Sequence, residues 1–139
     1  MGLLDQINAD LKKAMLARDE VTRDTLRMVK SELMTHEDAD PMTVVIKAVK
    51  SRRDSIASYR EGGRSDLVEK EEAEIAVLER YLPKQMSEAD ARDAVTALVA
   101  ELGLSSKKDL GRLMKEVMAR YRGQLDGKLA SKLAAELLD

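Results

Sequence analysis

Aromatic side chains are almost absent from this chain, and this constrains its fold more than any other feature. Only 2% of the 139 residues are aromatic, with three tyrosines and neither phenylalanine nor tryptophan. Aromatic and β-branched side chains favour pleated sheets, so a β-sandwich or a mixed sheet would be unusual here. The apolar residues that remain are mainly Leu, Val, Ile, Ala and Met, which fill the cores of helical bundles. We therefore predict an all-α fold.

In the first half of the chain, apolar residues recur every three or four positions, which is the spacing of one face of an α-helix. Asp40 is expected to cap a helix that has Pro41 in its first turn, and Ser65 or Asp66 to cap the next one. Pro83 stops that last helix, because proline disfavours helical geometry in the residue before it. The sequence thus predicts a four-helix N-terminal domain over residues 1–84, with helices over about 2–18, 20–34, 41–61 and 65–82.

After Pro83 the chain restarts with shorter helices. The segment Ser87-Glu88-Ala89-Asp90 resembles a capping box for a helix that ends at Gly103. A second helix is expected from Ser106 to near Gly123, and Asp126 is expected to cap a third. Residues 87–139 are therefore predicted to form a small three-helix C-terminal domain, which at about 53 residues would be marginally stable alone.

Charge and cysteine content limit the classes of function. Residues 61–102 carry 5 basic and 11 acidic side chains, whereas residues 103–139 carry 8 basic and 5 acidic ones. The basic end permits contact with nucleic acid without requiring it. The absence of cysteine excludes disulfides and fits a reducing compartment. No stretch is apolar for long enough to cross a bilayer, and the N-terminus lacks the features of a signal or transit peptide. We predict a cytoplasmic protein that does not contact membranes.

No group of side chains resembles an active site. His36 is the single histidine and there is no cysteine, so a metal centre or a histidine-activated nucleophile cannot be assembled. We expect His36 at the C-terminal end of the second helix, where it would meet the helix dipole. Residues 123–128 lack the spacing and the Ser or Thr of a phosphate loop. The sequence predicts no catalytic residues, no metal and no cofactor, and so no enzyme activity of the chain by itself.

Two charged residues fall on helix faces that are otherwise apolar. Arg52 lies between Val49 and Ile56, and Glu71 lies four residues from Leu67. We predict an ion pair between Arg52 and Glu71, buried or half-buried between the third and fourth helices. A structural role that fixes the register of the helices is favoured over a catalytic one.

Several segments together resemble the bacterial YqeY family, and the resemblance covers essentially the whole chain. In the first half they are Leu3-Leu4, Leu26-Arg27-Met28-Val29-Lys30, Arg52-Arg53-Asp54-Ser55 and Lys70 to Gln85, the last with Glu74 and Tyr81-Leu82-Pro83-Lys84-Gln85. In the tail they are Gly111-x-x-Met114-Lys115, Gly123, Asp126-Gly127-Lys128 and Leu137-Leu138. The tail is also similar to the C-terminal appendage of the GatB subunit of the tRNA-dependent amidotransferase. The connection from His36 to Pro41 looks shorter than in many relatives.

This resemblance implies a link to tRNA and to carbon–nitrogen ligation with glutamine as amide donor, although the ligation machinery has no counterpart in these residues. Our leading hypothesis is a non-catalytic module that contacts tRNA, or a tRNA-handling enzyme, through its C-terminal domain. The alternatives are a protein–protein adaptor without nucleic-acid contact and an enzyme that works only within a complex. The candidate contacts for tRNA or a partner are Lys107, Lys108, Gly111, Arg112, Met114, Lys115, Arg120, Arg122, Gly123 and Lys128.

Overall fold

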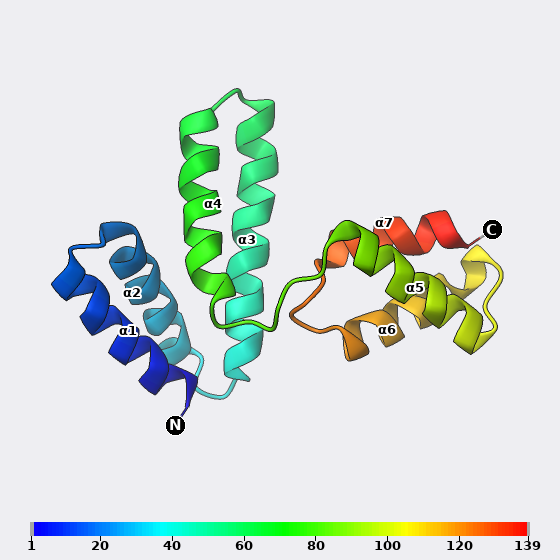
Figure 1. Ribbon diagram of the computed structural model, residues 1–139, viewed down its shortest axis with the longest axis horizontal. Coiled ribbons are helices and arrows are strands. Elements are labelled where there is room, and N and C mark those ends of the chain that lie inside the picture. Colours follow the sequence, from blue (N-terminus) through cyan, green and yellow to red (C-terminus); the bar gives the residue numbers. More distant parts are fainter. Residues whose placement is uncertain (1, 139) are drawn as a thin grey trace. The chain divides into compact units, whose positions relative to one another are not determined.

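The computed structural model describes residues 2–138, and all regular secondary structure in that range is helical (Figure 1). This confirms the all-α prediction. The elements are α1 (Leu3–Ala17), α2 (Glu20–Thr35), α3 (Pro41–Glu61), α4 (Ser65–Glu79), α5 (Glu88–Leu102), the 3-10 turn η1 (Lys107–Asp109), α6 (Leu110–Arg120) and α7 (Gly127–Leu137).

Contacts between residues divide the chain into two compact units, Met1–Pro83 and Lys84–Asp139. In the first unit α3 and α4 form a long hairpin, α2 packs against both of them, and α1 packs on α2 (Figure 1). Its core is aliphatic, and Ile7, Leu26 and Leu78 are completely buried. Two tyrosines, Tyr59 and Tyr81, only border this core.

The second unit holds α5, η1, α6 and α7, and each of its three α-helices packs against the other two. Leu113, Leu133 and Val95 are completely buried at its centre. Tyr121 packs against the edge of this second core. The two cores share no residue, so each unit buries its own apolar surface.

Most helices of the chain begin where the sequence indicates. The carboxylate of Asp40 accepts a hydrogen bond from the backbone N–H of Met42 at 3.2 Å, and Pro41 occupies the first turn of α3. Ser87 and Asp126 cap α5 and α7 in the same way. His36 lies at the C-terminal end of α2, as expected.

Three helix boundaries differ from the predictions. The residue before α4 is Arg64, so neither Ser65 nor Asp66 is its cap. Instead Asp66 lies in the first turn and its two carboxylate oxygens accept from Arg64 at 3.2 and 3.1 Å. Helix α4 ends at Glu79 rather than continuing to residue 82. The helix expected from Ser106 begins as the turn η1 and becomes α-helical only at Leu110.

Candidate functional site

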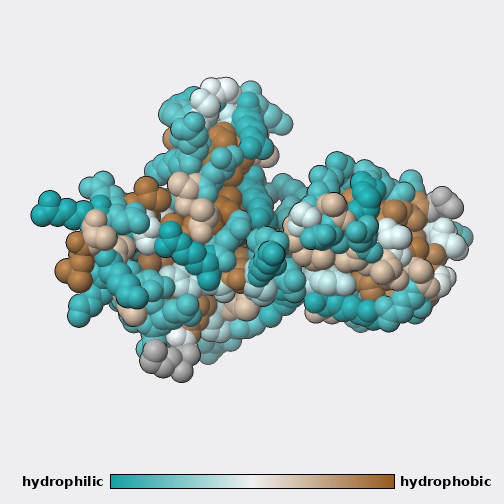
Figure 2. Space-filling model, viewed as in Figure 1, coloured by the Kyte–Doolittle hydropathy of each residue, from teal (hydrophilic) through white to brown (hydrophobic). Residues whose placement is uncertain are grey.

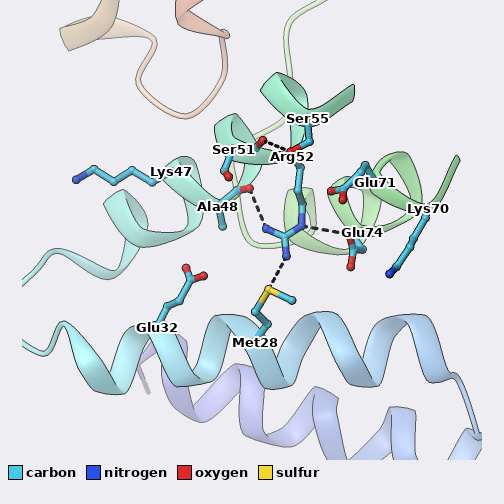
Figure 3. A pocket seen from close by; sticks show the side chains of 10 residues that line it. All are labelled: Met28, Glu32, Lys47, Ala48, Ser51, Arg52, Ser55, Lys70, Glu71 and Glu74. Carbon is cyan, nitrogen blue, oxygen red and sulfur yellow. Dashed lines mark hydrogen bonds and ion pairs between the residues drawn. The ribbon is translucent and has the colours of Figure 1, made fainter. Parts of the chain in front are cut away.

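Three helices of the first unit, α2, α3 and α4, line an open pocket of about 410 Å³ (Figure 3). Its walls are mostly polar, and Met28 is the one large apolar side chain among its lining residues. Such a volume lies within the range of small-molecule sites. The lining residues are Met28, Glu32, Lys47, Ala48, Ser51, Arg52, Ser55, Lys70, Glu71 and Glu74.

The guanidinium of Arg52 lies at the centre of this pocket, and the residue is only 9% exposed (Figure 3). One terminal nitrogen, Nη1, donates to the carbonyl oxygen of Ala48 at 3.0 Å. The other, Nη2, donates to the sulfur of Met28 at 3.0 Å. The buried Nε lies 3.5 Å from Oε2 of Glu74 and has no hydrogen-bond partner among the described residues. The guanidinium therefore joins all three helices.

Two carboxyl groups of α4 lie beside Arg52, and they differ in their surroundings. Glu74 is 9% exposed and forms the ion pair with Arg52. Glu71 is half-buried. Its pKa is raised above the ordinary value by burial, and further by the charge of Glu74 and a hydrogen bond with it, while Arg52 and Lys70 act in the opposite direction. The pocket thus contains one carboxylate that is paired with a guanidinium and one whose ionisation is disfavoured by its surroundings.

The residue that pairs with Arg52 is therefore Glu74, and the sequence-based prediction named Glu71. Helix α4 buries Val68, Ile75, Val77 and Leu78, which turns Glu74 inward and leaves Glu71 at the edge. The prediction took Leu67 as part of the inward stripe, but Leu67 is only half-buried. The apolar pair Val77 and Leu78, three and four residues after Glu74, was the signal in the sequence that could have identified it.

In the second unit, four of the candidate cations are exposed and lie close together in the chain. Lys107 and Lys108 lie on η1, Arg112 and Lys115 lie on α6, and all four are exposed. Positions 108, 112 and 115 follow helical spacing, opposite the buried Leu113 and Val117 of α6. We call these four residues the basic face. Gly111 is exposed beside it, and Met114 packs against the core instead.

The remaining candidates are placed differently. Arg120 forms a two-pronged ion pair with Glu101, at 2.7 and 3.2 Å, and lies 3.6 Å from Glu116. The guanidinium also lowers the pKa of the Glu101 carboxyl. Arg122 and Lys128 are exposed and have interactions of their own. Gly123 has a φ of 80°, a conformation that glycine adopts without strain.

Residues on either side of the boundary between the units form hydrogen bonds, each within its own unit, that no sequence pattern predicted. The hydroxyl of Tyr81 donates to Oδ2 of Asp10 on α1 at 2.6 Å. The side-chain amide of Gln85 donates to the carbonyl of Gly123, and the backbone N–H of Met86 donates to the carbonyl of Gln124 at 2.9 Å. Gln85 and Gly123 both belong to the segments that carry the family resemblance, and here they meet.

No helix within residues 2–138 has the length and hydropathy needed to span a membrane. In the same range, no three potential metal-ligating side chains of His, Cys, Asp or Glu come together.

Among the known proteins that this chain resembles are several named altered inheritance of mitochondria protein 41, mitochondrial. The protein of Pyrenophora tritici-repentis is 29% identical over 147 residues, which cover 98% of this chain and 81% of that protein. The protein of Kluyveromyces lactis is 42% identical over 107 residues, 66% of this chain and 58% of that protein. For Lachancea thermotolerans the identity is 35% over 111 residues, 72% of this chain and 59% of that protein. The match thus spans less than two thirds of the latter two relatives.

These relatives correct the prediction of a cytoplasmic protein, because their names assign them to mitochondria. The absence of cysteine could not separate the two locations, since it fits any reducing compartment. The family model described as Yqey-like protein matches residues 4–138. The chain therefore belongs to the YqeY-like family.

Proposed function

We propose that the second unit binds RNA of the tRNA class through the basic face, without catalysis of its own. The observation that carries this proposal is that the four cations of the basic face form no ion pairs with neighbouring carboxylates. Within the described residues, Lys107, Lys108, Arg112 and Lys115 form no ion pair, whereas Arg120 on the same helix is paired with Glu101. Cations without carboxylate partners are available to phosphate groups.

Binding on this face would depend on phosphate contacts and on RNA shape. Tyr121 is the single aromatic residue of the second unit and packs against its core, so it offers no open platform for stacking bases. Double-stranded RNA is read mainly through its backbone and shape. The similarity of the tail to the GatB appendage supports tRNA as the form of RNA.

Fluorescence anisotropy with labelled tRNA at several salt concentrations tests this proposal. If three or four phosphates are contacted, log K should fall with log salt with a slope of about −3. Arg112→Glu/Lys115→Glu should weaken binding at least tenfold and flatten that slope. Lys12→Glu/Lys132→Glu makes the same change in net charge on other faces and serves as the matched control. Equal loss in both variants, or no binding at low salt, would contradict a site on this face.

A second candidate function, a protein–protein adaptor, is favoured by the apolar surface of α1 and α2. The large hydrophobic side chains that are exposed within residues 2–138 all lie on these two helices, and Leu16 is 79% exposed. Part of this surface is visible on the left of Figure 2. The set comprises Leu4, Met15, Leu16, Val21, Met28 and Met34. Binding there would depend little on salt, and Leu16→Lys would weaken it while leaving RNA binding unchanged.

We further propose that the two units are separate folding domains, with four helices and three helices respectively. Their separate hydrophobic cores support this, as does the division of contacts at Pro83 and Lys84. Expression of each unit alone tests the proposal.

A further inference from the structure

The pocket of the first unit contains a charged hydrogen-bond donor whose acceptor is weak. Nη2 of Arg52 donates to the thioether sulfur of Met28, which is a weak acceptor. A guanidinium normally binds carboxylate or phosphate oxygens, and such charge-assisted bonds are about twice as strong as neutral ones. Met28 is 46% exposed and unbranched, so its side chain can move away. An anionic oxygen that took the place of the sulfur would strengthen the bonding of Arg52.

The same pocket contains a carboxyl group that has no cation of its own. Glu71 forms no ion pair among the described residues, because the nearest guanidinium, that of Arg52, is paired with Glu74. Two carboxyl groups side by side cannot both ionise easily. A positively charged donor placed against Glu71 would offset that repulsion and favour the ionised carboxylate.

The charges around the pocket also limit the net charge of an occupant. Glu32, Glu71 and Glu74 balance Lys47, Arg52 and Lys70. A polyphosphate or a polyamine would meet as much repulsion as attraction on such walls. In Figure 3 the guanidinium of Arg52 lies between Glu74 on one side and Glu32 on the other. Positive and negative groups are therefore close neighbours in the pocket wall, and Nε of Arg52 lies only 3.5 Å from Oε2 of Glu74.

We propose that this pocket binds a small polar zwitterion of the free α-amino acid class, with its carboxylate on Nη2 of Arg52 in place of the Met28 sulfur and its ammonium group on Glu71. The volume of about 410 Å³ accommodates a molecule of that size. The charged side chains at the rim, Glu32, Lys47 and Lys70, favour a polar ligand side chain. This inference is independent of RNA binding by the second unit.

Protein-observed NMR on the full chain, with each of the twenty common α-amino acids added separately, tests the proposal. At about 10 mM ligand, a site with a dissociation constant near 1 mM would be mostly occupied. At least one polar amino acid should shift the resonances of Met28, Arg52 and Glu71. Its N-acetylated form lacks the ammonium group, and its amide lacks the carboxylate. Each should bind at least tenfold more weakly.

Two variants separate ligand binding from folding. Glu71→Gln should retain the fold and weaken binding at least tenfold, whereas Glu69→Gln, an exposed carboxylate of the same helix outside the pocket, should bind as the parent does. Met28→Leu removes the competing sulfur without touching the charges and should bind as tightly or more tightly. The proposal is overturned if no amino acid shifts the pocket resonances, if the shifts map to another surface, or if Glu71→Gln binds normally.

Discussion

Arg52 and the two carboxyl groups beside it show how far single residues can be predicted from sequence. Its position between Val49 and Ile56 indicated an inward side chain, and the residue is 9% exposed. The choice between Glu71 and Glu74 depends on a rotation of α4 by less than one turn. Apolar residues cover a broad arc of that helix, so periodicity alone does not resolve such a rotation.

Replacing each of the two glutamates separately by glutamine should affect the free energy of unfolding differently at neutral pH. Glu74→Gln leaves the buried Arg52 without its counter-charge and should lower the free energy of unfolding by about 3 kcal/mol. Glu71→Gln should leave the free energy of unfolding unchanged or raise it, because ionisation of this carboxyl is less favourable in the folded chain than in the unfolded one. Urea unfolding followed by circular dichroism measures both variants, and an equal loss in the two would contradict this assignment.

The raised pKa of Glu71 also predicts a dependence on pH. Above the ordinary value of 4.5, the unfolded chain loses this proton while the folded chain retains it. The contribution of Glu71 to stability therefore falls as the pH rises through that range, until the folded carboxyl has ionised as well. The parent should lose stability relative to Glu71→Gln as the pH rises above about 4.5. A constant difference across a series of urea titrations would exclude the effect.

Helices as elements were easier to predict than their ends. Asp40, Ser87 and Asp126 cap as expected because a cap is a local interaction of residues two or three apart. The early end of α4 was missed. Tyr81, two residues beyond its end, donates a hydrogen bond to Asp10, 71 positions earlier, and no local pattern contains such a contact.

Replacing either of two glycines in or near α6 by alanine should change the stability of the second unit, in opposite directions for the two positions. Gly123 has a φ of 80°, so Gly123→Ala should lower the stability of the second unit by about 1 kcal/mol. Gly111 is helical, and a Cβ there would meet nothing within 4 Å. Gly111→Ala should therefore raise stability by about 0.5 kcal/mol. Thermal unfolding of the two variants tests the contrast. A loss of RNA affinity in the more stable Gly111→Ala would support close approach of RNA at that position.

For the whole molecule, the sequence predicted two parts, and the structure adds hydrogen bonds at the start of the second unit. The predicted second domain began at residue 87, whereas Gln85 and Met86 bond to Gly123 and Gln124. Helical periodicity cannot predict these bonds because neither Gln85 nor Met86 is helical. They are part of the second unit through hydrogen bonds and through the packing of Met86 against its core.

The starting point of a C-terminal fragment should therefore matter. A fragment that begins at Lys84 retains the bonds of Gln85 and Met86, and a fragment that begins at Ser87 loses both. At about 1 kcal/mol for each bond, the shorter fragment should melt about 10 °C lower. Calorimetry on the two fragments measures this, with Gln85→Ala in the longer one isolating the side-chain bond. Equal melting temperatures would show that the segment 84–86 does not stabilise the unit.

The rarity of aromatic residues has a practical consequence for such measurements. Tyr59 and Tyr81 border the first core and Tyr121 the second, and the chain has no tryptophan. The fluorescence of a Tyr59→Phe/Tyr81→Phe protein would therefore come from Tyr121 alone. One chromophore would then report unfolding of the second unit inside the intact chain, while the parent signal is dominated by the first.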